Sequence, residues 1–129
     1  ALARAQARLA KQARAVTWIA TDVTAFRPTD LYDIWHDRAA FHFLTERADV
    51  ARYVATARQA LVPGGLLVIG TFSEQGPTKC SGIAIQQYSE TTLAEVWRDG
   101  FRKEVCVTAD HPTPFGTVQN FIFGVFRRI

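Results

Sequence analysis

Four side chains that can bind a metal ion or move a proton lie in two parts of the chain. His36 and Asp37 are adjacent, His42 follows closely, and His111 lies near the C-terminus. Imidazole and carboxylate groups bind divalent metals, and a metal with open coordination positions activates water. The spacing matches no established motif of the HExxH kind, so the prediction depends on a fold that brings the four together. His36, Asp37 and His111 are also the candidate catalytic residues.

Simpler roles exist for several of these side chains. His42 lies between Phe41 and Phe43, which is typical of a hydrogen-bonded histidine in a hydrophobic core. Asp37 is placed to cap a short helix that begins near Arg38. Of the two thiols, Cys80 falls in a long loop and would be reactive if exposed, whereas Cys106 falls on a strand and is expected to be inert.

The elements that must position these residues follow from hydrophobic periodicity and from Gly and Pro signals. Pro63-Gly64-Gly65 ends one helix, and Ser89 is expected to be the N-cap of another. The expected elements, in order, are a helix over 2–14, strands over 16–21 and 32–35, a helix over 46–61, a strand over 66–72, a helix over 90–98, and strands over 103–110 and 118–126.

The last two strands differ in pattern. In 103–110 the apolar residues Val105, Val107 and Ala109 alternate with polar ones, which predicts one dry face, one wet face and a place at the sheet edge. The 118–126 strand is apolar on both faces and should lie inside, beside 66–72. The sequence therefore predicts an α/β domain with an antiparallel C-terminal hairpin. Ligand sites in such sheets lie beyond the carboxyl ends of the parallel strands, where His36, Asp37 and His111 would meet.

This ending, together with the segments DIWHDRAAFHFL and LVPGGLLVI, resembles the C-terminal two thirds of the class I S-adenosylmethionine-dependent methyltransferases. The resemblance implies a truncated Rossmann-like sheet whose strand order ends 4-5-7-6, with VTWIAT as strand 3. It implies S-adenosylmethionine as cofactor. Asp22, with Val23, matches the acid after strand 3 that binds the adenine. His36, Asp37 and His111 would orient the methyl acceptor.

The resemblance does not extend to the N-terminal part of the family's fold, which holds most of the cofactor. The family's Gly-rich loop follows strand 1, but all eight glycines here lie at or beyond Gly64. We therefore expect a truncated or repurposed member that binds the cofactor poorly. Without strands 1 and 2, the edge of strand 4 is unpaired, so we expect a homodimer in which strand 3 or the basic helix within 1–15 is exchanged between subunits.

Composition limits the other classes of function. The chain has 129 residues, 48% of them hydrophobic, which fits a single domain over 1–129. No apolar run approaches the ~18 residues that span a bilayer, so no membrane partner is expected. Two cysteines are too few for a disulfide scaffold and favour a cytoplasmic setting. Residues 1–21 contain four basic residues and no acidic one: Arg4, Arg8, Lys11 and Arg14. No aromatic residue lies among these charges, so nucleic acid is not the expected partner.

Three functions remain open at this point. The first is an S-adenosylmethionine-dependent methyltransferase, truncated or repurposed, that acts on a small-molecule substrate. The alternative is a metal-assisted hydrolase of esters or phosphoesters, with a divalent ion held by the histidines and aspartate named above. The third is a non-catalytic binding module that uses the basic N-terminal helix.

Overall fold

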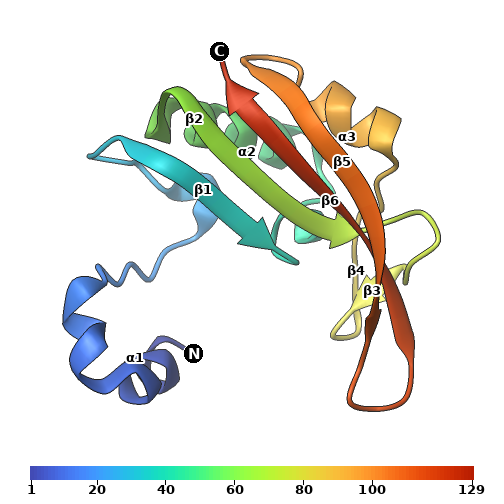
Figure 1. Ribbon diagram of the computed structural model, residues 1–129, viewed down its shortest axis with the longest axis horizontal. Coiled ribbons are helices and arrows are strands. Elements are labelled where there is room, and N and C mark those ends of the chain that lie inside the picture. Colours follow the sequence, from blue (N-terminus) through green and yellow to red (C-terminus); the bar gives the residue numbers. More distant parts are fainter.

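The computed structural model describes all residues, 1–129, and shows a four-stranded sheet with two helices packed on one face (Figure 1). A two-stranded hairpin, β3–β4, lies in the connection that follows β2. The elements are α1 (Leu2–Leu9), the 3₁₀ turns η1 (Ala10–Ala15), η2 (Val23–Ala25) and η3 (Phe41–Phe43), α2 (Arg47–Ala60), α3 (Glu90–Trp97), and strands β1 (Tyr32–Arg38), β2 (Leu61–Phe72), β3 (Lys79–Cys80), β4 (Ile83–Ala84), β5 (Phe101–Pro112) and β6 (Val118–Arg128).

The strand order of the sheet is β1-β2-β6-β5. β1 and β2 are parallel, and β6 runs antiparallel between β2 and β5. This confirms the predicted order 4-5-7-6 and the α/β class. β1 forms one edge of the sheet and pairs only with β2, as the sequence predicted. β1 is longer than expected, so His36 and Asp37 lie within the strand rather than after it.

The two helices cover one face of the sheet because each has one apolar side. α2 buries Tyr53, Ala57 and Ala60 against the strands. Ser89 caps α3 as predicted, and with Thr92 it forms a reciprocal capping box. The main core lies between these helices and the sheet, and is a cluster of thirteen buried residues: Phe41, Tyr53, Val54, Ala57, Leu61, Leu67, Ile69, Tyr88, Leu93, Trp97, Phe101, Ile122 and Phe126.

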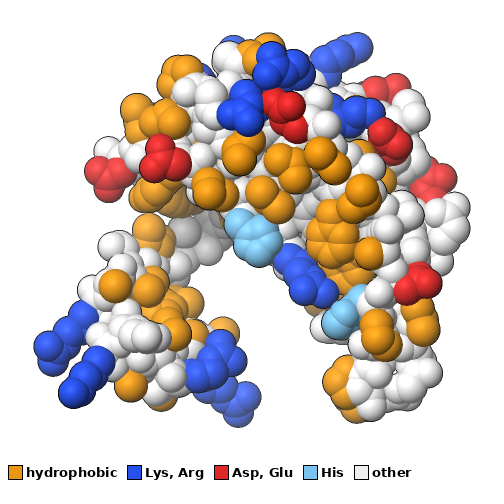
Figure 2. All heavy atoms as spheres, viewed as in Figure 1, with side chains coloured by type: hydrophobic (Ala, Val, Ile, Leu, Met, Phe, Trp, Pro, Cys, Tyr) orange, Lys and Arg blue, Asp and Glu red, His pale blue; other side chains and the backbone are white.

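The other side of the sheet carries no helix, and we call it the open face. Ile34, Val105 and Val107 on this side are 60%, 51% and 52% exposed, and Figure 2 shows hydrophobic side chains gathered over the strands. Partly buried neighbours continue the patch across the sheet: Leu66, Val68, Phe123 and Val125. The pattern of apolar residues on both faces of 118–126 correctly predicted an interior strand, but helices cover only one side of it.

The prediction of which face of β5 is buried was wrong. Cys106, on the side expected to be wet, packs against the main core, whereas Val105 and Val107 lie on the open face. Alternation in the sequence separates the two sides of a strand, but it does not say which side the helices will cover. The burial of Cys106 raises the pKa of its thiol, in keeping with the expected inert role.

The N-terminal segment differs most from prediction. Residues 16–21, expected as a strand, form none, because no strand lies beside them to take up their backbone hydrogen bonds. The predicted helix over 2–14 is present as α1 followed by η1. α1 buries no residue and stands away from the sheet (Figure 1). None of the helices has the length and apolarity needed to cross a bilayer.

Candidate functional site

The carboxyl ends of the parallel strands β1 and β2 lie at the same end of the sheet, and we call the open-face side of that end the rim. His36 and Arg38 alternate with Asp37 along β1, so both point to the open face. His111, near the end of β5, lies on the same side, and its Nδ1 is 3.4 Å from Nη2 of Arg38. Histidine and basic side chains are visible together on this face in Figure 2. The fold thus places two of the three predicted catalytic residues, His36 and His111, on the same face of the sheet, and Arg38 contacts His111.

Two aromatic rings support this arginine. The Arg38 guanidinium lies 5.3 Å from the ring centre of Phe121 and 5.9 Å from that of Phe123. His111 meets Phe121 edge to face at 6.0 Å. Arg38 has no carboxylate partner: it belongs to none of the ion pairs of the structure. We name His36, Arg38, His111, Phe121 and Phe123 the rim site.

A glycine makes this arrangement possible. Gly70 on β2 lies opposite Arg38 on one neighbouring strand and Phe123 on the other. A Cβ at this position would come within 2.6 Å of the Phe123 ring. The ring can therefore lie across β2 only because no side chain is present there, and it then forms part of the surface beneath Arg38.

Asp37 points to the opposite side of the sheet and is 7% exposed. Its Oδ1 accepts hydrogen bonds from the backbone N–H groups of Ala40 (3.0 Å) and Phe41 (3.2 Å), which begin the turn into η3. Its Oδ2 accepts one from the hydroxyl of Tyr53, which in turn accepts from Nε1 of Trp35 at 3.0 Å. These contacts hold Asp37 in the capping role, and it does not meet His36 or His111.

Tyr53 is suited to this donor role because its hydroxyl stays protonated. Burial raises the pKa of Tyr53 far above its usual range, and the charge of Asp37 and the hydrogen bond to it raise it further. The result is a permanent donor beneath β1, with Asp37 as its acceptor. The chain Trp35–Tyr53–Asp37 therefore links the first strand to α2 and to the turn that follows β1.

His42 is fully buried, in the simpler role considered for it. Its Nδ1 accepts a hydrogen bond from the backbone N–H of Phe72 at 3.2 Å, which places the ring proton on Nε2. Nε2 has no hydrogen-bond partner. Burial lowers the pKa of His42, and the nearby charge of Asp37 offsets part of that effect. His42 is thus a neutral core histidine.

The four predicted metal ligands do not converge. His36 and His111 lie on the open face, whereas Asp37 and His42 lie in the interior. No group of three or more His, Cys, Asp or Glu side chains is arranged to hold a metal ion. The hydrolase hypothesis therefore has no ligand set in this structure.

Asp22 and Val23 form the N-terminal turn of η2. Oδ1 of Asp22 accepts from the backbone N–H (2.8 Å) and hydroxyl (2.7 Å) of Thr24. These two hydrogen bonds lower the pKa of Asp22. Neither bond uses Oδ2, which leaves one oxygen to accept from an adenine amino group, and Val23 packs against the main core. The chain has no Gly-rich loop beside this acid, so its residues fit only part of the cofactor.

Sequence reasoning missed Arg38. The signal was the two-residue alternation of β1: in Trp35-His36-Asp37-Arg38, a strand that continues to its fourth residue puts His36 and Arg38 on one side. The predicted strand ended at residue 35, so the shared side of His36 and Arg38 was not recognised. Nothing local in the sequence indicated the aromatic surface, because Phe121 and Phe123 come from a strand far along the chain.

No protein-family profile and no curated protein matches the sequence. Solved structures do match: an S-adenosylmethionine-dependent methyltransferase from Mesorhizobium loti superposes with a TM-score of 0.74 at 22% identity, over 98% of this chain and 75% of that one. The chain has the fold of the S-adenosylmethionine-dependent methyltransferases. The predicted resemblance is thereby confirmed.

Two further methyltransferase structures show how much of the fold is covered. The N-methyltransferase NodS from Bradyrhizobium japonicum WM9 gives a TM-score of 0.70 at 19% identity, over 97% of this chain and 68% of that one. The Burkholderia thailandensis 1,6-didemethyltoxoflavin-N1-methyltransferase, with 1,6-didemethyltoxoflavin and S-adenosylhomocysteine bound, gives a TM-score of 0.72 at 20% identity, over 98% of this chain and 56% of that one. The chain thus spans about half to three quarters of these methyltransferase-fold structures.

Proposed function

We propose that this chain forms the methyl-acceptor side of an S-adenosylmethionine-dependent methyltransferase and that the rim site binds a small-molecule acceptor. The observation that carries the proposal is the position of Arg38. It lies at the carboxyl end of a parallel strand, where ligands bind in sheets of this kind, and it has no ion-pair partner. A guanidinium supported on aromatic rings is a good receptor for a carboxylate or phosphate group.

The rim residues divide the work in this proposal. S-adenosylmethionine would supply an electrophilic methyl group. Arg38 would bind an anionic group of the acceptor and so fix its orientation. Nδ1 of His111 faces Arg38 as an acceptor, which leaves Nε2 of His111 as a hydrogen-bond donor. His36, exposed on the same face, would take the proton from the attacking N–H or O–H group.

The residues of this chain set a limit on its own affinity for the methyl donor. With Asp22 as the one acid at the expected position and no Gly-rich loop, we expect binding weaker than about 100 µM, or −5.5 kcal/mol. The methyl donor should nevertheless contact η2 and the rim site when present at millimolar concentration.

NMR titration of the labelled chain with S-adenosylhomocysteine tests the proposal. We expect amide shifts at Asp22, Val23 and the rim site, and smaller shifts at Asp22 in the Asp22→Asn variant. Asp30→Asn, an exposed aspartate between η2 and β1, is the matched control and should behave like the unaltered chain. Shifts confined to other surfaces, or none at millimolar ligand, would refute the assignment of the rim.

We also propose a homodimer in a cytoplasmic setting. The unpaired edge of β1, the open face and the lack of buried residues in α1 support pairing or exchange between two copies. The two cysteines are free thiols, in keeping with a reducing compartment. Sedimentation equilibrium at micromolar concentration should give twice the chain mass, and a compact monomer would contradict the dimer.

A further inference from the structure

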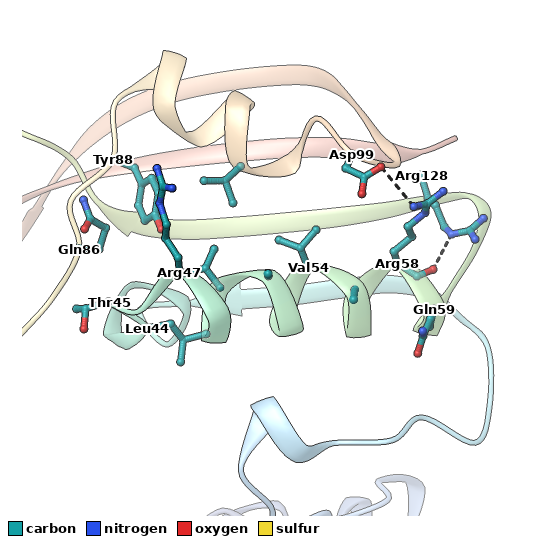
Figure 3. A pocket seen from close by; sticks show the side chains of 14 residues that line it. Leu44, Thr45, Arg47, Val54, Arg58, Gln59, Gln86, Tyr88, Asp99 and Arg128 are labelled. Carbon is teal, nitrogen blue, oxygen red and sulfur yellow. Dashed lines mark hydrogen bonds and ion pairs between the residues drawn. The ribbon is translucent and has the colours of Figure 1, made fainter.

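A groove runs between α2 and α3, on the side of the sheet away from the rim site (Figure 3). Its volume is about 890 Å³, and seven of its fourteen lining residues are hydrophobic. Three of the hydrophobic side chains are valines, Val50, Val54 and Val96. Ala51 and Ala55 leave room along the exposed side of α2. The middle of the groove is thus apolar and runs alongside α2.

Positive charge lies at both ends of this groove. Figure 3 shows Arg47 beside Tyr88 at one end and Arg58 with Asp99 and Arg128 at the other. Arg47 has no ion-pair partner. Arg58 reaches Asp99 at 3.4 Å in an exposed pair, and Nε of Arg128 donates to the carbonyl of Arg58 at 2.6 Å.

The lining therefore holds three guanidinium groups and one carboxylate. An exposed ion pair such as that of Arg58 with Asp99 contributes little to stability. Arg58 therefore remains free to exchange Asp99 for a carboxylate of a ligand. The apolar middle and the two cationic ends together define what the groove can bind.

We propose that this groove docks an acidic amphipathic helix of another protein. Arg47 and Arg58 are eleven residues apart on α2, which is about 16 Å at 1.5 Å per residue. A helix lying alongside α2 would carry carboxylates at the same eleven-residue spacing, which is about three turns and so keeps them on one face. Apolar residues between them, on that face, would meet Val50 and Val54.

Other occupants match the groove less well. A fatty acid has a single carboxylate and would leave one cationic end unsatisfied. An extended strand would need the edge of a sheet to pair with, and neither edge strand, β1 or β5, lines the groove. The chain's own α1 is basic, so the same arginines would repel it.

A designed peptide tests the proposal. The probe is a fluorescent Ala-rich helix with two glutamates eleven positions apart and two leucines between them on the same face. Fluorescence anisotropy should show saturable binding, and Arg47→Glu and Arg58→Glu should each weaken it at least about tenfold. Arg52→Glu is the matched control: Arg52 is also exposed on α2 but does not line the groove.

Three results would overturn the proposal. One is an equal loss of affinity in Arg52→Glu and the groove variants, because that would indicate attraction to net charge alone. Another is equal binding of a peptide with the same residues scrambled onto different faces. The third is palmitate binding to the groove while the acidic peptide does not bind. A peptide with lysine in place of the glutamate facing Arg47 should restore binding to Arg47→Glu, and this swap decides the matter even if Arg58→Glu fails to fold.

Discussion

The substitution Tyr53→Phe tests the interior role that the structure gives to Asp37. Tyr53 is 1% exposed, and its ring packs against Trp35, Phe41 and Trp97 with ring centres 5.0–5.8 Å apart. Phenylalanine keeps all of these contacts. The substitution therefore removes only the hydroxyl that donates to Asp37 and accepts from Trp35.

The magnitude follows from these two hydrogen bonds. A bond to a charged acceptor contributes about 1.5–3 kcal/mol, and the partly buried indole N–H that loses its acceptor costs about 1 kcal/mol more. We expect the free energy of unfolding to fall by about 3 kcal/mol, a large share of the roughly 5–15 kcal/mol typical of a domain. Urea denaturation monitored by circular dichroism measures the change.

The control and a coupled variant make this test decisive. Tyr32→Phe makes the same chemical change on β1 at an exposed position and should alter stability by less than about 0.5 kcal/mol. Asp37→Asn combined with Tyr53→Phe should show a coupling energy of at least about 0.5 kcal/mol, since the two groups are in contact. A Tyr53→Phe protein as stable as the unaltered chain would refute the structural role of this pair.

Three further outcomes are expected. Because burial lowers the pKa of His42, the unfolded chain binds its proton more readily below about pH 6.5, so stability should fall as the pH drops through that range. His42→Gln, which keeps an acceptor for Phe72, should flatten that fall in urea titrations between pH 5 and 7.5, and an unchanged slope would contradict the assignment. Gly70→Ala should cost about 1–3 kcal/mol by displacing the Phe123 ring, and pairing it with Phe123→Leu should recover part of the loss; no thermal shift in Gly70→Ala would contradict the packing. Ser89→Ala should cost about 1 kcal/mol through loss of the α3 cap, seen as a lower thermal midpoint, whereas Ser89→Thr should retain most of it.

The candidate site was predictable only in part, for reasons visible at single residues. The chemistry-bearing types and their place at one end of the sheet follow from the sequence, so His36 and His111 were expected near each other. Asp37 was grouped with them because adjacent residues look equivalent in a sequence. In a strand, however, neighbours point to opposite sides, and the extra length of β1 moved Asp37 into the core and put Arg38 at the rim.

The sequence by itself determined the four segments that form the sheet and the positions of the last two strands within it. The doubly apolar pattern of β6 and the alternating pattern of β5 specify an interior and an edge position, and local signals such as Ser89 specify helix ends. Tertiary structure alone decided which side of the sheet the helices cover, that 16–21 forms no strand, and that Arg38 rests on Phe121 and Phe123. The physical reason is that periodicity and caps are local, whereas a strand needs a neighbour and a face is buried only by what packs on it.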